Sequence, residues 1–307
     1  MKQVAVLLMA YGTPNSLDDV EAYYADIRGG RKPSPELVHE LKARYERIGG
    51  KTLLLEITRA QANGVQNALG DDYRVYVGMK HWRPYIAQTV EEIARRGHTR
   101  VIALALAPHY SRFSIDGYAQ RVRAAMDNIG ATFDVTFVQS WNDEPLYIAS
   151  LVERMDQTRA KFEVNDWADV HVIFSAHSLP ERILQGGDPY PQELRETCEL
   201  VAAQLGLQEN EWRFAYQSAG RTGEKWLGPD ILDALDMAAH QGHKRVMIAP
   251  IGFVADHLEI LYDIDVECAE RARALGIEMQ RIPSANASPT FVAALEAVVR
   301  THVRQDG

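Results

Sequence analysis

The stretch PYIAQTVEEIARRGHTRV, residues 84–101, decides the fold because its pattern returns later in the chain. Residues 229–246 read PDILDALDMAAHQGHKRV, so a proline, an isoleucine, a Gly-His pair and an Arg-Val pair all recur 145 residues later. Each copy predicts an amphipathic helix, a glycine turn and an apolar strand in the same register. A second echo pairs residues 10–14, AYGTP, with residues 176–180, AHSLP. The sequence therefore predicts two similar domains that arose by duplication.

Short apolar runs alternate with amphipathic stretches along the whole chain, which is the βαβα pattern of parallel sheets covered on both faces. We expect strands near residues 3–9, 73–77, 100–107, 133–139, 169–175, 213–217, 245–250 and 277–281. Helices are expected near residues 16–28, 34–48, 56–69, 84–97, 116–129, 145–162, 190–205, 229–241, 256–275 and 288–304. The predicted class is α/β, with two Rossmann-like, doubly wound domains.

The length of 307 residues fits two domains, since a domain has about 150 residues. We expect one domain over residues 1–150 and the other over residues 151–307, with the C-terminal helix crossing back to the first. Ligands of such sheets bind outside the carboxyl ends of the strands. The cleft between the two domains is therefore the expected site.

Composition excludes several classes of protein. The 33 Lys and Arg against 42 Asp and Glu give a net charge of −9, which repels nucleic acid. Apolar runs such as residues 4–10 are far shorter than the roughly 20 residues of a membrane-spanning helix, and no signal-peptide cleavage pattern follows the first run. We expect a cytoplasmic protein. The only cysteines, Cys198 and Cys268, cannot supply an iron–sulfur cluster or a disulfide framework.

A basic segment stands out against this acidic background. Residues 28–51 hold seven Lys and Arg and three Glu, a local charge of +4. Tyr23, Tyr24 and Tyr45 are interleaved with these charges. The segment could hold an aromatic or hydrophobic plate that carries carboxylates, because guanidinium groups bind carboxylates well. The alternative is a pair of exposed helices with basic faces.

An acidic pattern follows a predicted strand end near residue 253. On a regular helix over residues 256–275, Glu259, Asp263 and Glu267 fall on one face at four-residue spacing, with Asp256 one turn earlier. Like charges at this spacing destabilise a helix, which a bound or passing cation would offset. His257 adds an imidazole ligand beside them. The alternative is a solvated acidic face.

Three further side chains follow strand ends, where α/β proteins place reactive groups. His177 ends a predicted strand of the second domain, and Tyr11 follows the matching strand of the first. His109 follows another strand end. Histidines on loops of rigid strands serve as acids, bases and ligands, although a lone histidine is more often structural. Duplication places Tyr11 and His177 on opposite walls of one cleft. No dinucleotide fingerprint, P-loop or nucleophile elbow is present.

Five motifs together resemble the ferrochelatase family in order over nearly the whole chain: MAYGTP at 9–14, LAPHYS at 106–111, SAHSLP at 175–180, WLGP at 226–229 and GFVADHLE at 252–259. The compact length and the MAYGTP start are similar to those of bacterial coproporphyrin III ferrochelatases, which insert ferrous iron to give coproheme in haem biosynthesis. The resemblance implies a monomeric lyase of class II chelatase-like fold with a porphyrin cleft. Its partners would be porphyrin and ferrous iron as substrates, and neighbouring enzymes of haem biosynthesis in transient contacts.

The resemblance also implies roles for particular residues. His177 and Glu259 match the catalytic pair on one face of the macrocycle and the inner metal ligands. Tyr11 matches a tyrosine on the opposite face, axial to the product iron. The porphyrin-binding positions are Tyr11, Arg28, Arg44, Tyr45, Thr52 and Tyr118. Asp263 and Glu267 match outer metal-site carboxylates. The implied enzyme needs no cofactor and holds no iron–sulfur cluster; relatives commonly have Ser-Pro where this chain has Thr52-Leu53.

Residue chemistry agrees with this implied reaction. Metal insertion removes two pyrrole protons, and a neutral His177 could bind iron or accept a proton while Glu259 passes protons along the acidic stripe. Which of the two delivers metal stays open. Alternatives are a protoporphyrin IX ferrochelatase, a cobalt or nickel sirohydrochlorin chelatase, and a non-catalytic tetrapyrrole carrier.

Overall fold

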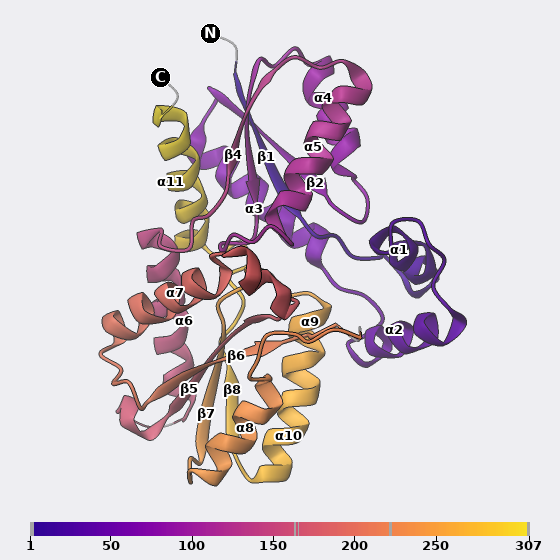
Figure 1. Ribbon diagram of the computed structural model, residues 1–307. Helices are drawn as coiled ribbons and strands as arrows, with labels where there is room; N and C mark the ends of the chain where they lie inside the picture. The colour runs from indigo at the N-terminus through magenta and orange to yellow at the C-terminus, as the bar shows by residue number, and fades with distance from the viewer. Residues whose placement is uncertain (1–2, 163, 165, 221–222, 306–307) are drawn as a thin grey trace. The chain divides into compact units, whose positions relative to one another are not determined.

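The protein is described by a computed structural model that covers residues 3–162, 164, 166–220 and 223–305 (Figure 1). The chain divides into two compact units. Unit 1 comprises residues 1–141, 255–258 and 286–307, and unit 2 comprises residues 142–254 and 259–285. The chain thus changes unit before α6 (Pro145–Arg159), whereas residue 150 lies inside that helix.

Unit 1 contains a four-stranded parallel sheet of order β2-β1-β3-β4 with helices on both faces (Figure 1). Its elements are β1 (Val4–Ala10), η1 (Leu17–Asp19), α1 (Val20–Ile27), α2 (Pro35–Arg47), α3 (Leu54–Leu69), β2 (Tyr73–Met79), α4 (Ile86–Arg95), β3 (Arg100–Ala105), α5 (Ile115–Ile129), β4 (Asp134–Val138) and α11 (Pro289–Gln305). Ala5, Leu7 and Met9 of β1 pack in one core with α4 and α5. On α3, a Cβ at Gly64 would lie 2.8 Å from Val292, so these two helices pack closely.

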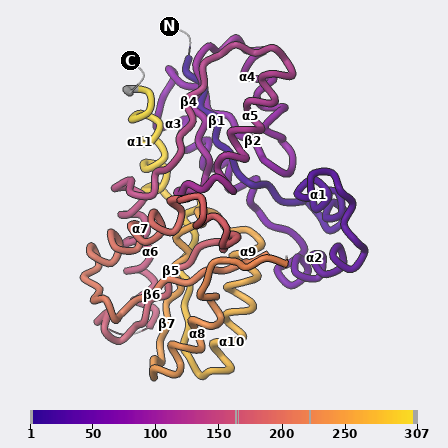
Figure 2. Tube along the Cα trace, in the orientation of Figure 1, coloured from indigo at the N-terminus to yellow at the C-terminus, as the bar shows by residue number. Residues whose placement is uncertain are grey.

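Unit 2 repeats this architecture with the order β6-β5-β7-β8, again all parallel. Its elements are α6, η2 (Ala160–Phe162), η3 (Trp167–Asp169), β5 (His171–His177), η4 (Glu181–Gly186), α7 (Tyr190–Leu205), β6 (Trp212–Gln217), α8 (Ile231–His240), β7 (Arg245–Pro250), η5 (Asp263–Cys268), α10 (Ala269–Leu275) and β8 (Glu278–Arg281), with α9 (Leu258–Leu261) bridging the division of units. The Cα trace in Figure 2 follows the chain through the labelled elements of both units. The predicted fold class, two Rossmann-like parallel-sheet halves, is confirmed.

The 145-residue repeat corresponds to matching local structure. Helices α4 and α8 each have 10 residues, and strands β3 and β7 each have 6. The Met79 N–H donates to Pro84 O at 2.7 Å, and the Tyr216 N–H donates to Pro229 O at 2.8 Å. The two copies of the repeat therefore fold into the same local backbone structure.

The prediction of one regular helix over residues 256–275 is wrong. Four α-helical residues are followed by η5, a π-helix in which the Glu267 N–H donates to Tyr262 O at 3.0 Å, and only then by α10. The carboxylates therefore do not form one regular stripe. Asp256 leaves the pattern altogether, because its N–H and carboxylate both bond Asn286, at 3.0 and 2.8 Å.

A search of the described part of the chain finds no helix that is both long and apolar enough to cross a bilayer. Among the described residues the longest helix, α11, has 17 residues.

Candidate functional site

In unit 2, His177 and Glu259 form a pair. His177 ends β5, and its Nε2 lies 3.4 Å from Glu259 Oε1 on α9. Its Nδ1 donates to Ser178 O, which fixes the ring and leaves Nε2 as the reactive nitrogen. About a third of each side chain is exposed, 33 % for His177 and 37 % for Glu259. The pair can therefore meet a ligand.

The charge state of His177 differs from the expected one. Burial of the ring disfavours its charged form, but the Glu259 carboxylate, the bond to Ser178 and the charge of Asp263 outweigh burial and raise the pKa of His177 to about 9. The neutral His177 expected near pH 7 is therefore wrong for the unliganded site. The resting pair is an imidazolium beside a carboxylate.

Two aromatic rings flank His177. The rings of Trp226 and Phe253 each lie with their centroids 6.4 Å from the imidazole, tilted by 52° and 57°. From the adjacent helix α7, Tyr190 donates its hydroxyl to His177 O at 2.9 Å. The reactive nitrogen thus stands among apolar rings, which suit a flat aromatic ligand.

A buried glutamine ties Glu259 to the strands. Gln217 ends β6 and is fully buried; its Nε2 donates to Glu259 O at 3.0 Å, and its Oε1 accepts from Ser175 Oγ at 2.8 Å. The Ser178 N–H also donates to Gln217 O at 2.7 Å. Gln217 therefore connects both partners of the pair to the sheet.

The outer carboxylates differ in exposure. Asp263, the first residue of η5, is 7 % exposed and accepts a hydrogen bond from Ser218 Oγ. Ser218 adopts the left-handed φ of 60°, which is uncommon for a residue other than glycine and often marks a functional position. Glu267 is only half-buried. Of the two predicted outer residues, Asp263 is the one that the fold orients.

No three His, Cys, Asp or Glu side chains in the described residues are grouped so that they could hold a metal ion. His177 and Glu259 supply two protein ligands at most. His257, proposed from sequence as a further ligand, belongs to unit 1.

Tyr11 lies in unit 1, where it follows β1 and is 39 % exposed. Its ring centroid is 4.5 Å from that of His81, whose Nδ1 bonds Asp26 Oδ2 at 2.8 Å. Arg121 bonds the same carboxylate oxygen at 3.2 Å. Burial, against the bond to Asp26, lowers the pKa of His81 to about 4, so this ring is neutral at pH 7.

Lys80 and His81 were missed by the sequence analysis. Burial, together with the charge of Arg121, lowers the pKa of Lys80 to about 8, and its ammonium lies 4.9 Å from the centroid of the Tyr118 ring. The available signal was their position: they directly follow β2, which pairs with the strand that leads to Tyr11.

The predicted porphyrin-binding residues are not all at the surface. Tyr45 is only 1 % exposed and packs with Val20 and Val38 in a small core between α1 and α2. Its ring is therefore part of the fold of the basic segment. Thr52 is 7 % exposed, and its hydroxyl donates to Thr13 Oγ1 at 2.9 Å.

Arg28 and Arg44 are both partly exposed. Arg28 Nε is buried without a hydrogen-bond partner. Arg44 forms a long ion pair with Glu40, at 3.9 Å. No described contact joins either arginine to Tyr11.

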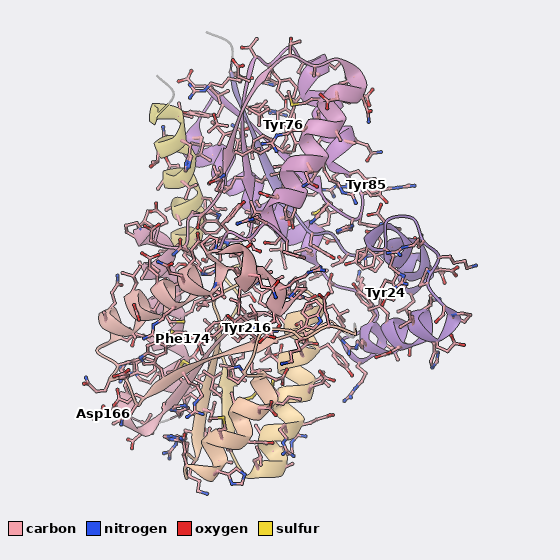
Figure 3. The ribbon with its side chains drawn as sticks, in the orientation of Figure 1. Tyr24, Tyr76, Tyr85, Asp166, Phe174 and Tyr216 are labelled. Atoms are coloured by element: carbon pink, nitrogen blue, oxygen red, sulfur yellow. The ribbon has the colours of Figure 1, made fainter. Side chains whose placement is uncertain are left out.

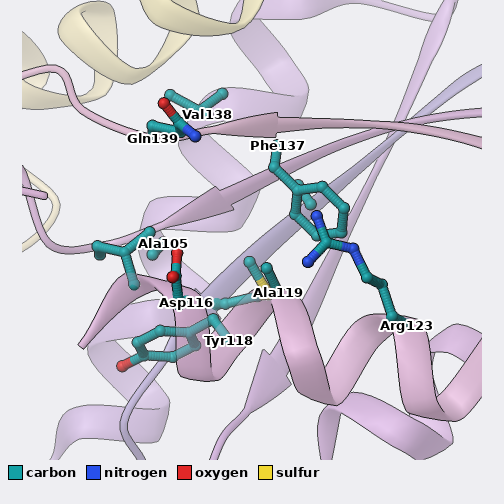
Figure 4. Close-up of a pocket in the computed structure, with 11 residues that line it drawn as sticks. Ala105, Asp116, Tyr118, Ala119, Arg123, Phe137, Val138 and Gln139 are labelled. Atoms are coloured by element: carbon teal, nitrogen blue, oxygen red, sulfur yellow. The ribbon is translucent and has the colours of Figure 1, made fainter. Parts of the chain in front are cut away.

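Tyr118 is 6 % exposed and lines a cavity of about 40 Å³ beneath α5 (Figure 4). Asp116 also lines it and accepts a hydrogen bond from Tyr110 at 2.9 Å, while Arg123 stacks over Phe137 at 4.7 Å. A water needs about 10–15 Å³ of such space, so the cavity can hold a few waters but no macrocycle. His109, the other strand-end histidine, is 2 % exposed, and burial lowers its pKa to about 3.

Comparison with solved structures identifies the class. The sirohydrochlorin chelatase SirB from Bacillus subtilis, solved with Fe³⁺, matches with a TM-score of 0.65 over 98 % of this chain and 95 % of that one, at 10 % identity. CbiX, described as the terminal enzyme of siroheme biosynthesis in denitrifying bacteria, matches with a TM-score of 0.55 over 97 % and 98 %. The fold is that of the class II chelatases.

Sequence comparison then gives the family. The ferrochelatase family model matches residues 3–303. A ferrochelatase of Herpetosiphon aurantiacus is 47 % identical over 301 residues, covering 97 % of this chain and 98 % of its own. A coproporphyrin III ferrochelatase of Bacillus subtilis is 40 % identical over 304 residues, covering 97 % of both. The chain belongs to the ferrochelatase family.

Proposed function

We propose that this ferrochelatase acts on coproporphyrin III and inserts ferrous iron to give coproheme. The observation that carries this choice is the basic segment, residues 28–51, with its charge of +4 in a chain of −9. Coproporphyrin has four propionates and protoporphyrin has two, so the segment favours the more anionic ring. Relatives named coproporphyrin III ferrochelatases, at 39–43 % identity, support the same choice.

Arg28 is the propionate contact that the structure supports best. Its Nε has no hydrogen-bond partner, and a buried donor of this kind gains most from a carboxylate. Lys80 joins the proposed set. It directly precedes His81, whose ring contacts that of Tyr11, and its ammonium lies over the Tyr118 ring. Tyr11 is proposed as the ligand of the product iron on the face opposite His177.

In the proposed reaction, His177 begins protonated and paired with Glu259. Fe²⁺ that approaches Glu259 compensates the carboxylate charge that holds this proton, so the proton leaves to water and Nε2 is exposed as a base. Nε2 then accepts one pyrrole proton, and Glu259 accepts the second and releases it to water. His177 ends as it began, and two protons are released for each iron inserted.

A site with two protein ligands suits this task. The four nitrogens of the macrocycle must displace the protein from the metal, and a complete cage of protein ligands would retain it. Asp263 follows Glu259 by four positions in the chain, and Ser218 orients its carboxylate. We propose Asp263 as the next acceptor of protons or metal after Glu259. We also propose that no resident cofactor takes part; the two cysteines of the chain are both buried.

The test is iron insertion into coproporphyrin III and into protoporphyrin IX at one salt concentration. We expect the larger kcat/KM for coproporphyrin, and we expect Arg28→Gln to reduce that advantage about fivefold or more. Lys42→Gln makes the same charge change elsewhere in the segment and serves as the matched control. Equal or faster turnover of protoporphyrin would overturn the substrate assignment.

A further inference from the structure

A polar pocket of about 400 Å³ lies at the amino edge of the sheet of unit 1. The lining residues come from the start of β1, from β2 and from the turn between α4 and β3: Gln3, Arg74, Tyr76, Arg96, Gly97 and His98. Tyr11 follows the other end of β1, so the pocket lies at the opposite edge of this sheet. Figure 3 labels Tyr76 among the strands of unit 1.

The floor of the pocket is a chain of two hydrogen bonds that starts from a buried tyrosine. Tyr76 is 7 % exposed, and its hydroxyl bonds His98 Nε2 at 2.8 Å. His98 Nδ1 in turn bonds Gln3 O at 3.0 Å. Because a backbone carbonyl only accepts, Nδ1 carries a proton in this bond. The His98 ring is therefore held by a hydrogen bond at each nitrogen.

The rim carries two guanidinium groups. Arg96 bonds Glu92 at 2.9 Å, whereas Arg74 makes no ion pair among the described residues and contacts the Tyr76 hydroxyl. Both side chains are exposed. The charge of Arg74 is thus not paired with a carboxylate. This arrangement favours an anion that can accept hydrogen bonds from both guanidinium groups.

The duplicated unit provides an internal comparison. The shared register places Arg213 where unit 1 has Tyr76, and Glu211 and Gln241 where unit 1 has Arg74 and Arg96. There the side chains bond one another: Arg213 donates to His171 Nε2 at 2.8 Å and to Gln241 Oε1. His171, at the position of Ala5, stacks on His243 with centroids 4.2 Å apart.

At the amino edge of the sheet, polar side chains therefore pair with one another in unit 2 and line a pocket in unit 1. At the positions of Arg74 and Arg96, the counterpart edge has a carboxylate and an amide. We propose that the pocket of unit 1 binds a compact multivalent anion, a phosphate or a small polycarboxylate. Its volume lies within the range of small-ligand sites, about 300–1,000 Å³.

The test is isothermal titration of the full-length protein with sodium pyrophosphate and, separately, sodium citrate, at about 0.15 M salt. The variant that combines Arg74→Glu with Arg96→Gln installs the residues of unit 2 at the same positions. We expect one-site binding to the unchanged protein and a loss of about tenfold or more in this variant. Tighter binding of pyrophosphate assigns a phosphate ligand, and tighter binding of citrate assigns a carboxylate ligand.

Two controls make the outcome decisive. Arg59→Glu reverses an exposed charge on α3 outside the pocket and should keep the affinity within about twofold. Arg28→Gln should also keep it, which separates this pocket from the proposed propionate contacts. If the double variant still inserts iron, it is folded. The single variant Arg74→Gln repeats the binding test with a smaller change. Equal binding by the double variant, loss of binding in Arg28→Gln, or no binding of either anion by the unchanged protein would each overturn the proposal.

Discussion

The Nε2 of Gln217 donates to the backbone oxygen of Glu259 at 3.0 Å, so a side chain at the end of one strand holds the helix that carries the carboxylate of the pair. Glu259 lies on α9, which has only four residues, so this short helix by itself does little to hold the side chain in place. The orientation of Glu259 toward His177 therefore depends on a residue that touches neither imidazole nor carboxylate.

Gln217→Glu should uncouple this support. The new carboxylate can still accept from Ser175 but, when ionised, cannot donate to Glu259 O, so the hydrogen bond that holds α9 is lost. We expect a loss of about 1–3 kcal/mol in the free energy of unfolding and a lower kcat. Ser175→Ala removes only the other bond of Gln217 and should affect kcat less. Urea unfolding and iron insertion measure the two effects; equal losses of kcat in both variants would argue against the role of Gln217.

His177→Ala should reduce iron insertion by about 10²–10⁴-fold, the range expected for loss of a proton-transfer group. Fold stability should change little, because a third of the ring is exposed. His240→Ala changes an exposed histidine of α8 and is the matched control. A His177→Ala variant with near-normal insertion rates contradicts the assignment.

Stability should fall as pH falls from 6.5 toward 4, partly through His81. Its pKa is about 4 in the folded chain against 6.5 for an ordinary histidine, so between these values the unfolded chain binds a proton that the folded chain does not. His81→Asn should therefore flatten the pH dependence of the free energy of unfolding by on the order of 2 kcal/mol over this window. Urea titrations at pH 4.5 and 7 measure the difference, and parallel curves for the two proteins would refute it.

Gly252→Ala should displace the loop that leads from β7 to Glu259. An added Cβ would lie 2.6 Å from the Cβ of Ala176, the residue before His177. Overpacking of this kind costs about 1–3 kcal/mol, and insertion activity should fall with it. Combining the change with Ala176→Gly removes the opposing atom and should restore part of both losses. If the double variant is no better than Gly252→Ala, the contact is not the cause.

The duplication could be predicted from the sequence because the residues that recur have strong effects on local structure. Proline, glycine and the apolar positions of residues 84–101 recur at 229–246, and the structure gives both stretches the same helix and strand lengths. The positions of Tyr11 and His177 after matching strands followed from the same logic. Their placement across a shared cleft stays a prediction.

Other features depend on tertiary contacts that no local pattern encodes. The resemblance implies a porphyrin-binding role for Tyr45, and the structure places its ring in the core between α1 and α2. His177 was expected to be neutral, but Glu259, 82 positions away in the chain, lies 3.4 Å from it and stabilises its charged form. Lys80 and His81 went unnoticed because no motif marks them; only the pairing of β2 with β1 brings them to Tyr11.

The π-helix after Glu259 has an implication for how this chain can change in length. Each of its wide turns contains one residue more than an α-helical turn, as in the bond from the Glu267 N–H to Tyr262 O. Loss of a single residue within Asp263–Cys268 could be absorbed by reversion to an ordinary helix, leaving α10 and β8 in their register. The cost would fall on Asp263, whose direction toward Ser218 depends on the wider turn. A deletion here would therefore change the orientation of the Asp263 carboxylate while leaving the rest of the fold in place.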